Sequence, residues 1–352
     1  MKDVTKTFCV LPFYGYEFPL RTPCCLLTNE ESLDTVKNMM LAGDRPASCN
    51  ACWSLEDAGI ESDRLLKNKM IDYYRDLSLE NLITECEQGN NKVISYKIDT
   101  SNTCNGACVT CVPASSSTWI KVFQDNAEHT RHTSWQILPE AIDFVDYANA
   151  KTISFRGGEP FLSKTNFSIL EKLIEHNNTD CFISFVTNGS STLSRRQKEI
   201  LLNFNNLNFC ISIDGIGQVF EYLRWPLRWE TVLENIAWAR ENNIDISVSY
   251  TVSNMNLLYM NDTVKWFKDN DLTYIINPVK FPVHFKPSTL PKEIKLQLKN
   301  TSMSEMPADW FEHSTEDDKN FELFKTEIEK QDKWKGTSIK ECLPEFAEML
   351  GL

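Results

Sequence analysis

Six short segments rich in β-branched and aromatic residues alternate with amphipathic helical patterns between residues 92 and 281. Each segment is followed closely by Asp, Gly or Asn, which are residues that end strands. The predicted strands are Val93–Ile98, Thr152–Phe155, Cys181–Val186, Phe209–Ile213, Ile246–Val252 and Tyr274–Ile276. Strands that alternate with helices form a parallel sheet with crossover connections. The sequence therefore predicts an α/β fold, and six units leave a partial barrel and a doubly wound sheet both possible.

Cysteine-, glycine- and Asn/Asp-containing motifs follow four of these predicted strands. In chain order they are Cys104-x3-Cys108-x2-Cys111, Gly157-Gly158-Glu159-Pro160, Thr187-Asn188 and Ser212-x-Asp214. Because the carboxyl ends of parallel strands share one edge of a sheet, the four motifs should lie together in one site. That edge is where α/β barrels carry their chemistry, so the placement favours the barrel.

The three cysteines after the first strand provide three thiolates from one short loop. A [4Fe–4S] cluster normally takes four thiolates, so three would leave one iron open to a ligand that is not part of the protein. A zinc site is the alternative, and it needs a fourth ligand. His129 and His132 have the right chemistry for that role, but they lie far along the chain.

The triad together with Gly157-Gly158-Glu159-Pro160 resembles the radical S-adenosylmethionine (radical SAM) superfamily over about residues 92–281. The resemblance implies a partial (β/α)6 TIM-type barrel, a [4Fe–4S] cluster on the triad, and S-adenosylmethionine (SAM) as cofactor. In such enzymes one electron from the cluster cleaves SAM into methionine and a 5′-deoxyadenosyl radical. That radical abstracts a hydrogen atom from the substrate, and the chain would be classed as an oxidoreductase.

The resemblance also implies which residues bind the cofactor. Gly157, Gly158, Glu159 and Pro160 would bind its ammonium, Thr187, Asn188, Ser212 and Asp214 its ribose, and Arg224 its carboxylate, while Thr251 would border the adenine. A surface arginine is the alternative for Arg224. One departure from the family pattern is Thr110, which stands before the third cysteine where many members have an aromatic residue.

Five further cysteines lie within the first 52 residues. Their spacing resembles the twitch-domain (SPASM/twitch-like) subgroup and implies an auxiliary [4Fe–4S] cluster. The predicted ligands are Cys9, Cys24, Cys49 and Cys52, with Cys25 as the alternative to Cys24. A structural zinc site on the same sulfurs is the alternative interpretation.

The remaining cysteines lead to two expectations. Cys25 and Cys342 are the candidate catalytic thiols, because a thiol can return a hydrogen atom to a product radical, although a buried thiol without a role is the simpler interpretation of each. Cys181 and Cys210 lie in apolar segments and are expected to be small buried side chains.

Three regions follow from these patterns. Residues 1–91 are predicted to be a cysteine-rich auxiliary-cluster segment, residues 92–285 the radical SAM core, and residues 286–352 a C-terminal helical extension. In the extension, Ile339, Leu343, Phe346 and Leu350 make an apolar stripe that should dock one terminal helix on the body.

Composition indicates the partners and the cellular compartment of such a chain. The net charge of −13 argues against non-specific binding to nucleic acid. The start has no signal-like apolar core, and no apolar run approaches the length of a membrane span. Twelve cysteines in clusters, rather than in a secreted framework, favour metal binding in a reducing cytoplasm.

The expected function is radical chemistry on a peptide or protein side chain, because enzymes with this auxiliary-cluster arrangement often modify peptides. The same chemistry on a small metabolite (a sugar, nucleoside or amino acid) is the alternative. A non-catalytic iron–sulfur electron carrier is a remote third interpretation, which the strand-end motifs disfavour. The expected redox partner is a donor of the flavodoxin or ferredoxin type.

Overall fold

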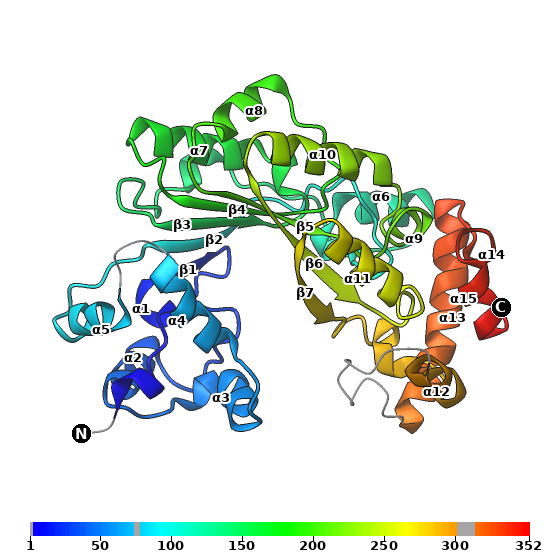
Figure 1. Ribbon diagram of the computed structural model, residues 1–352, viewed down its shortest axis with the longest axis horizontal. Coiled ribbons are helices and arrows are strands. Elements are labelled where there is room, and N and C mark those ends of the chain that lie inside the picture. Colours follow the sequence, from blue (N-terminus) through cyan, green and yellow to red (C-terminus); the bar gives the residue numbers. More distant parts are fainter. Residues whose placement is uncertain (1–2, 74–77, 301–313) are drawn as a thin grey trace.

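A computed structural model describes residues 3–73, 78–300 and 314–352, and seven parallel strands form one sheet in it (Figure 1). The strands follow the order of the sequence across the sheet. They are β1 (Gly15–Phe18), β2 (Ser95–Asp99), β3 (Thr152–Arg156), β4 (Phe182–Thr187), β5 (Leu207–Ser212), β6 (Asp245–Val252) and β7 (Thr273–Pro278). Within the described ranges β1 and β7 do not pair, so the barrel is open. The predicted α/β fold with a partial barrel is confirmed.

Strand β1 is an element that the sequence analysis did not predict. It pairs in parallel with β2, with Gly15 opposite Ser95 and Phe18 opposite Ile98. Phe18 stacks on Phe144 with ring centroids 4.8 Å apart. The strand has only four residues and lies among prolines and cysteines, so its alternation was too short to recognise. The sheet therefore has one strand more than the six predicted.

The predicted strands agree with the structure except near their ends. β2 begins at Ser95 rather than Val93, β4 begins after Cys181, and β5 runs two residues further toward the amino end. Strand ends are the least certain part of any prediction from local pattern.

Helices cover one face of the sheet, and the alternation of side chains along the strands explains this arrangement (Figure 1). Ile183, Phe185 and Phe209 are buried in the core that these helices complete. Ser184 and Cys210 alternate with them and line the opposite, concave face. The helices are α6 (Ser117–Asp125), α7 (Lys164–Glu175), α8 (Arg195–Leu201), α9 (Gln218–Leu223), α10 (Trp229–Glu241) and α11 (Met260–Asp269).

The N-terminal segment packs below β1 and β2 around a small core of its own (Figure 1). Phe8, Met40 and Trp53 are buried in that core. Its helices are α1 (Leu11–Tyr14), α2 (Leu33–Leu41), α3 (Asn50–Asp57), α4 (Asp63–Tyr73) and α5 (Leu79–Glu87).

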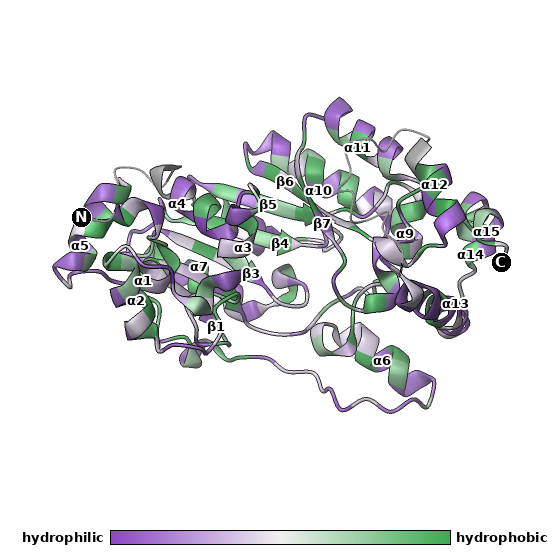
Figure 2. Ribbon diagram, turned by 90° about the horizontal axis from the view of Figure 1, so that it is seen from below, coloured by the Kyte–Doolittle hydropathy of each residue, from purple (hydrophilic) through white to green (hydrophobic). Residues whose placement is uncertain are grey.

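The C-terminal part docks on the other end of the sheet, as predicted, and buries Ile339, Leu343 and Phe346. The single terminal helix was a wrong prediction, because Pro344 begins a second helix and Leu343 leaves the helical region with φ −133° and ψ 58°. The helices are α12 (Lys292–Asn300), α13 (Thr315–Lys335), α14 (Ile339–Cys342) and α15 (Pro344–Leu350). Among them α13 is largely hydrophilic (Figure 2).

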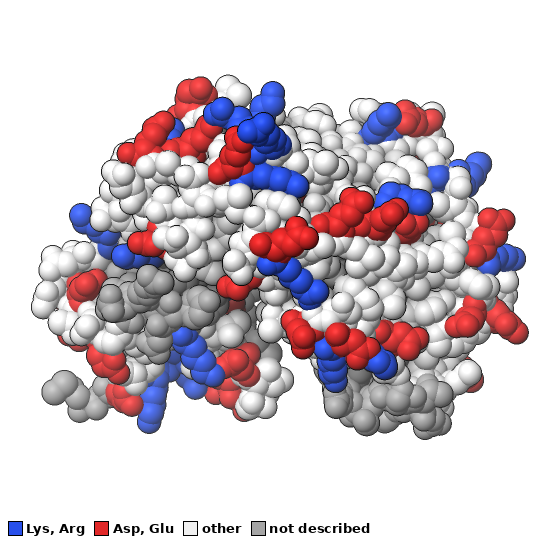
Figure 3. Space-filling model, turned by 45° about the horizontal axis from the view of Figure 1, so that its top comes forward, with Lys and Arg blue, Asp and Glu red and all other residues white. Residues whose placement is uncertain are grey.

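Over residues 3–73, 78–300 and 314–352 there are also seven short 3-10 turns: Val4–Lys6, Ala47–Cys49, Pro113–Ser115, Pro139–Ala141, Pro160–Leu162, Val283–Phe285 and Pro287–Thr289. Among the described residues, every helix is too short or too polar to cross a membrane. On the face shown in Figure 3, Lys and Arg side chains lie among Asp and Glu side chains, so the basic residues coloured there do not form one continuous surface.

Candidate active site

The loop that carries Cys104, Cys108 and Cys111 follows β2 at the carboxyl edge of the sheet and is held from two sides. On one side is the start of α6, where the Trp119 indole N–H donates to the Cys108 carbonyl at 2.9 Å. On the other side is the end of α9, where the Val109 N–H donates to the Leu223 carbonyl at 2.7 Å. These two hydrogen bonds hold the backbone of the loop, and neither involves a sulfur.

The three thiols lie in a poorly hydrated environment with cations close to them. Burial raises the pKa of Cys104 and of Cys111 to about 12, and it also raises the pKa of Cys108. Arg224 and Lys335 act on Cys108 in the opposite direction. Iron ligation would convert the thiols to thiolates, and nearby cations suit such an anionic group. Within the described ranges, no three His, Cys, Asp or Glu side chains are arranged to hold a metal ion as they stand.

Gly157 and Gly158 bring the end of β3 into contact with the chain that leads to the triad. The Gly158 N–H donates to the Ser101 carbonyl at 3.0 Å. A Cβ on Gly158 would lie 2.3 Å from the Thr103 carbonyl oxygen, and a Cβ on Gly157, where φ is +109°, would lie 2.5 Å from that of Ser101. Both glycines are therefore required by this packing, apart from any approach to a cofactor.

Glu159 links the end of β3 to the end of β4. Its side chain is fully buried, and its carboxylate accepts from the Thr187 hydroxyl at 2.7 Å and from the Asn188 N–H at 2.8 Å. The Asn188 side chain then donates to Asn105 in the triad loop at 2.7 Å. The structure thus brings three of the predicted cofactor-binding residues, Glu159, Thr187 and Asn188, together with the triad loop.

Burial raises the pKa of Glu159 to about 7 from an ordinary 4.5, in spite of the hydrogen bonds that favour the carboxylate. A raised pKa in the folded state means that the unfolded chain releases this proton first as the pH rises. We expect Glu159 to lower the stability of the cofactor-free protein by about 3 kcal/mol between pH 4.5 and 7. In urea unfolding over this pH range, the free energy of unfolding should decrease less for Glu159→Gln than for the wild-type protein. An equal dependence of that free energy on pH in the two proteins would contradict the raised pKa of Glu159.

Asp214, Arg224 and Thr251 also meet at this edge. The Arg224 guanidinium pairs with the Asp214 carboxylate at 2.8 Å, and the Thr251 N–H donates to the same carboxylate at 3.1 Å. The two side chains that were expected to hold different parts of a cofactor therefore bind each other. The Arg224 Nε is buried and has no hydrogen-bond partner, so it keeps one donor for a further group. Ser212 is half-buried at the end of β5.

Comparison with known proteins identifies this part of the chain. Residues 98–267 match the family model described as the radical SAM superfamily. These residues form a radical SAM domain. No curated protein matches the chain significantly.

Solved structures align with the chain at low similarity. anSMEcpe with bound AdoMet and a peptide is 21% identical over 58% of this chain and 58% of that chain, with a TM-score of 0.41. SuiB of Streptococcus suis bound to SAM is 15% identical over 70% and 55%, with a TM-score of 0.39. TsrM of Kitasatospora setae, a radical SAM methyltransferase with tryptophan bound, is 14% identical over 59% and 39%, with a TM-score of 0.39. Each alignment spans less than two thirds of the other chain.

The N-terminal cysteines form a second group, away from the radical SAM domain. Cys9, Cys24, Cys49 and Cys52 line one cavity together with Arg64, whereas Cys25 is exposed. Burial raises the pKa of Cys24 to about 11 and that of Cys49 to about 12. Arg64 is fixed beside them by a buried ion pair with Glu56 at 2.6 Å. The four sulfurs predicted as auxiliary ligands therefore face one space.

The two candidate catalytic thiols lie far apart in the structure. The Cys25 N–H donates to Glu17 at 3.2 Å, and Glu17 pairs with Lys97 on β2 at 2.6 Å, so Cys25 lies near the concave face. Cys342 ends α14, which packs against α9 at the far end of the molecule (Figure 1). Cys210, expected to be a buried core side chain, is half-buried and lines a cavity, so that prediction was wrong; Cys181 is buried as predicted.

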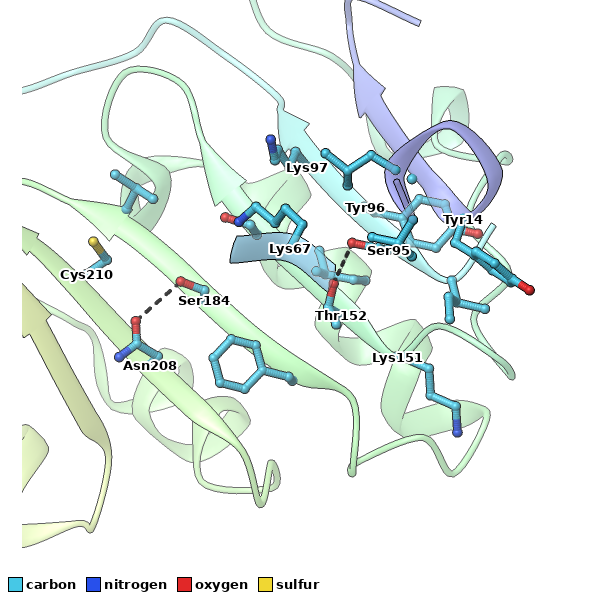
Figure 4. A pocket seen from close by; sticks show the side chains of 18 of the residues that line it. Tyr14, Lys67, Ser95, Tyr96, Lys97, Lys151, Thr152, Ser184, Asn208 and Cys210 are labelled. Carbon is cyan, nitrogen blue, oxygen red and sulfur yellow. Dashed lines mark hydrogen bonds between the residues drawn. The ribbon is translucent and has the colours of Figure 1, made fainter. Parts of the chain in front are cut away.

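A cavity of about 220 Å³ lies on the concave face between the sheet and the N-terminal segment (Figure 4). Lys67 on α4 and Lys97 on β2 point into its upper part. Apolar side chains, Val10 and Ile153 among them, line much of the rest. Hydroxyl, amide and thiol groups from the sheet lie between them: Ser95, Thr152, Ser184, Asn208, Cys210 and Ser247. This cavity was not predicted from the sequence, although small polar residues alternate with the apolar residues in β2 to β6.

Proposed function

We propose that this enzyme cleaves SAM reductively and uses the resulting 5′-deoxyadenosyl radical to abstract hydrogen from a peptide or protein side chain. The observation that carries the proposal is the meeting of the triad loop with two strand ends through Asn105, Asn188 and Glu159. When bound at the triad, a [4Fe–4S] cluster with one open iron would supply both the cofactor site and the electron.

The chain's own residues would hold and orient these groups. Cys104, Cys108 and Cys111 would bind the iron. The proposed cofactor contacts are Gly157, Gly158, Glu159, Pro160, Thr187, Asn188, Ser212, Asp214, Arg224 and Thr251. Because Asp214 already holds Arg224, the free Arg224 Nε is the donor that we assign to a cofactor carboxylate.

A substrate would occupy the concave face below this edge. Ile275 on β7 is 61% exposed and alternates with Tyr274 and Ile276, which pack against the core, so the concave face is open on the β7 side. An open concave face supports a peptide or protein substrate, because its side chain could enter the barrel while its main chain stays outside. The alternative, a small metabolite, is supported by the limited volume of the cavity, about 220 Å³.

The test is cofactor cleavage followed by label transfer. Oxygen-free protein reduced with dithionite should release 5′-deoxyadenosine from SAM, and a deuterated substrate should pass deuterium into that product. Libraries of deuterated peptides and of deuterated metabolites separate the two substrate classes. Protein that contains the cluster but releases no 5′-deoxyadenosine would contradict the proposal and favour an electron carrier.

We further propose that Cys9, Cys24, Cys49 and Cys52 hold an auxiliary [4Fe–4S] cluster, as in the twitch-domain subgroup. The shared cavity of the four sulfurs supports this assignment. A fully ligated cluster suits electron relay or bracing of the fold, with electrons supplied by a flavodoxin- or ferredoxin-type donor. A zinc ion on the same sulfurs is the alternative.

The paired cysteines provide a matched test of the auxiliary site. Purified protein with both clusters should contain about eight irons. Cys24→Ala should lose about half of them, because Cys24 faces the other three sulfurs. Cys25→Ala should keep all of them, because that side chain is exposed. Equal iron loss in both variants would contradict the assignment, and stoichiometric zinc in the wild-type protein would favour the zinc alternative.

A further inference from the structure

The last turn of α13 lies against the loop of the triad, although α13 is outside residues 98–267. The Gln331 side chain donates to the Val109 carbonyl at 3.3 Å. The Lys335 ammonium donates to the Gln331 side-chain Oε1 at 2.7 Å and lies 4.3 Å from the centre of the Trp119 ring. Trp119 itself bonds to the Cys108 carbonyl. Lys335 is therefore held in place by the groups that hold the loop.

The ammonium of Lys335 is buried and bonds to an amide rather than to a carboxylate. The residue is 8% exposed, and its hydrogen-bond acceptor is the Gln331 side-chain oxygen. The nearby cation Arg224 is neutralised by Asp214. An ammonium buried in this way is costly unless an anion offsets it. Burial lowers the pKa of Lys335 to about 7, while the sulfur of Cys108, the carboxylates of Asp332 and Glu327, and the sulfur of Cys111 favour its charged form.

We infer that Lys335 is a positioning residue whose positive charge stabilises the reduced state of an iron–sulfur cluster on Cys104, Cys108 and Cys111. The inference rests on the cluster that the proposed function places there. Reduction adds one negative charge to the cluster, and a cation held nearby in a poorly hydrated site favours that added charge. The C-terminal helix thus contributes to the electron transfer that starts the reaction, in addition to packing.

The test is a redox titration followed by electron paramagnetic resonance of the cluster whose signal changes when SAM is added. At a fixed potential, Lys335→Met should show a ratio of reduced to oxidised cluster about tenfold lower, which corresponds to a midpoint potential lower by about 59 mV. Lys335→Arg, which keeps the charge, should stay near the wild-type value. Lys335→Gln provides a second neutral variant if the methionine variant does not fold.

Lys330→Met is the matched control on the same helix. The Lys330 ammonium lies 4.4 Å from the centre of the Trp334 ring, but the side chain is 36% exposed and pairs with Glu327. Its removal should leave the midpoint potential unchanged. An unshifted midpoint potential in the neutral Lys335 variants, or an equal shift in Lys335→Arg, would overturn the inference about Lys335 and leave the proposed function intact. A wild-type protein without any SAM-responsive cluster signal would contradict the proposed function as well.

Discussion

Cys108→Ala is expected to reduce the release of 5′-deoxyadenosine to the background of the assay. Cys108 is the middle cysteine of the loop, and both Arg224 and Lys335 act on its sulfur. With two thiolates left, the loop cannot hold a cluster that has a single open iron. The Cys108 carbonyl accepts from the Trp119 indole and the Val109 N–H donates to the Leu223 carbonyl, so neither bond involves the sulfur and the loop should keep its conformation. Chromatography of the product and the iron content together measure the effect.

Cys181→Ala is the matched control, because this cysteine is buried in the core near the start of β4. It should keep its iron and its cleavage activity and lose only about 1 kcal/mol of stability. Cys108→Ala protein that still cleaves SAM at the wild-type rate would show that the triad is not the cluster site. Cys108→Ala protein that keeps half of its iron would be consistent with a separate auxiliary cluster.

The sequence predicted the sheet and its functional edge because both depend on local patterns. The alternation of Ile183, Phe185 and Ser184 marks a strand, and a glycine or asparagine marks its end. Because strands that follow each other in the chain are neighbours in the parallel sheet, their carboxyl ends lie side by side. Strand β1 was missed because four residues carry too little alternation to predict a strand.

Contacts between segments that are distant in the chain could not be predicted from local sequence patterns. Lys335 meets the triad loop more than 200 residues after it in the chain, and nothing in the hydrophilic pattern of α13 distinguishes it from the exposed lysines. The pairing of Arg224 with Asp214 is a second example, since each residue was assigned separately from its motif. The resemblance to a family identified these residues, but only the fold shows that they contact each other.

Gly158→Ala is expected to cause a loss of SAM cleavage of about 100-fold with a modest loss of stability. The added Cβ would lie 2.3 Å from the Thr103 carbonyl oxygen and 2.7 Å from the Asn102 carbonyl carbon. Both are backbone atoms, so the clash can be relieved only if the end of β3 and the triad approach move apart. Such overpacking costs about 1–3 kcal/mol. A shift of about 1 Å between groups that must meet a cofactor costs about 100-fold in rate.

Gly106→Ala separates this effect from any general sensitivity of the loop to an added methyl group. A Cβ on Gly106 would lie 3.3 Å from a methyl carbon of Leu227, the end of a flexible side chain that can move. We expect the Gly106 variant to retain most of its activity, whereas the Gly158 variant should bind iron and cleave SAM about 100-fold more slowly. Calorimetric titration with SAM and the rate of 5′-deoxyadenosine release measure the two effects. Equal activity in the two variants would mean that the contact between β3 and the triad approach does not position the cofactor.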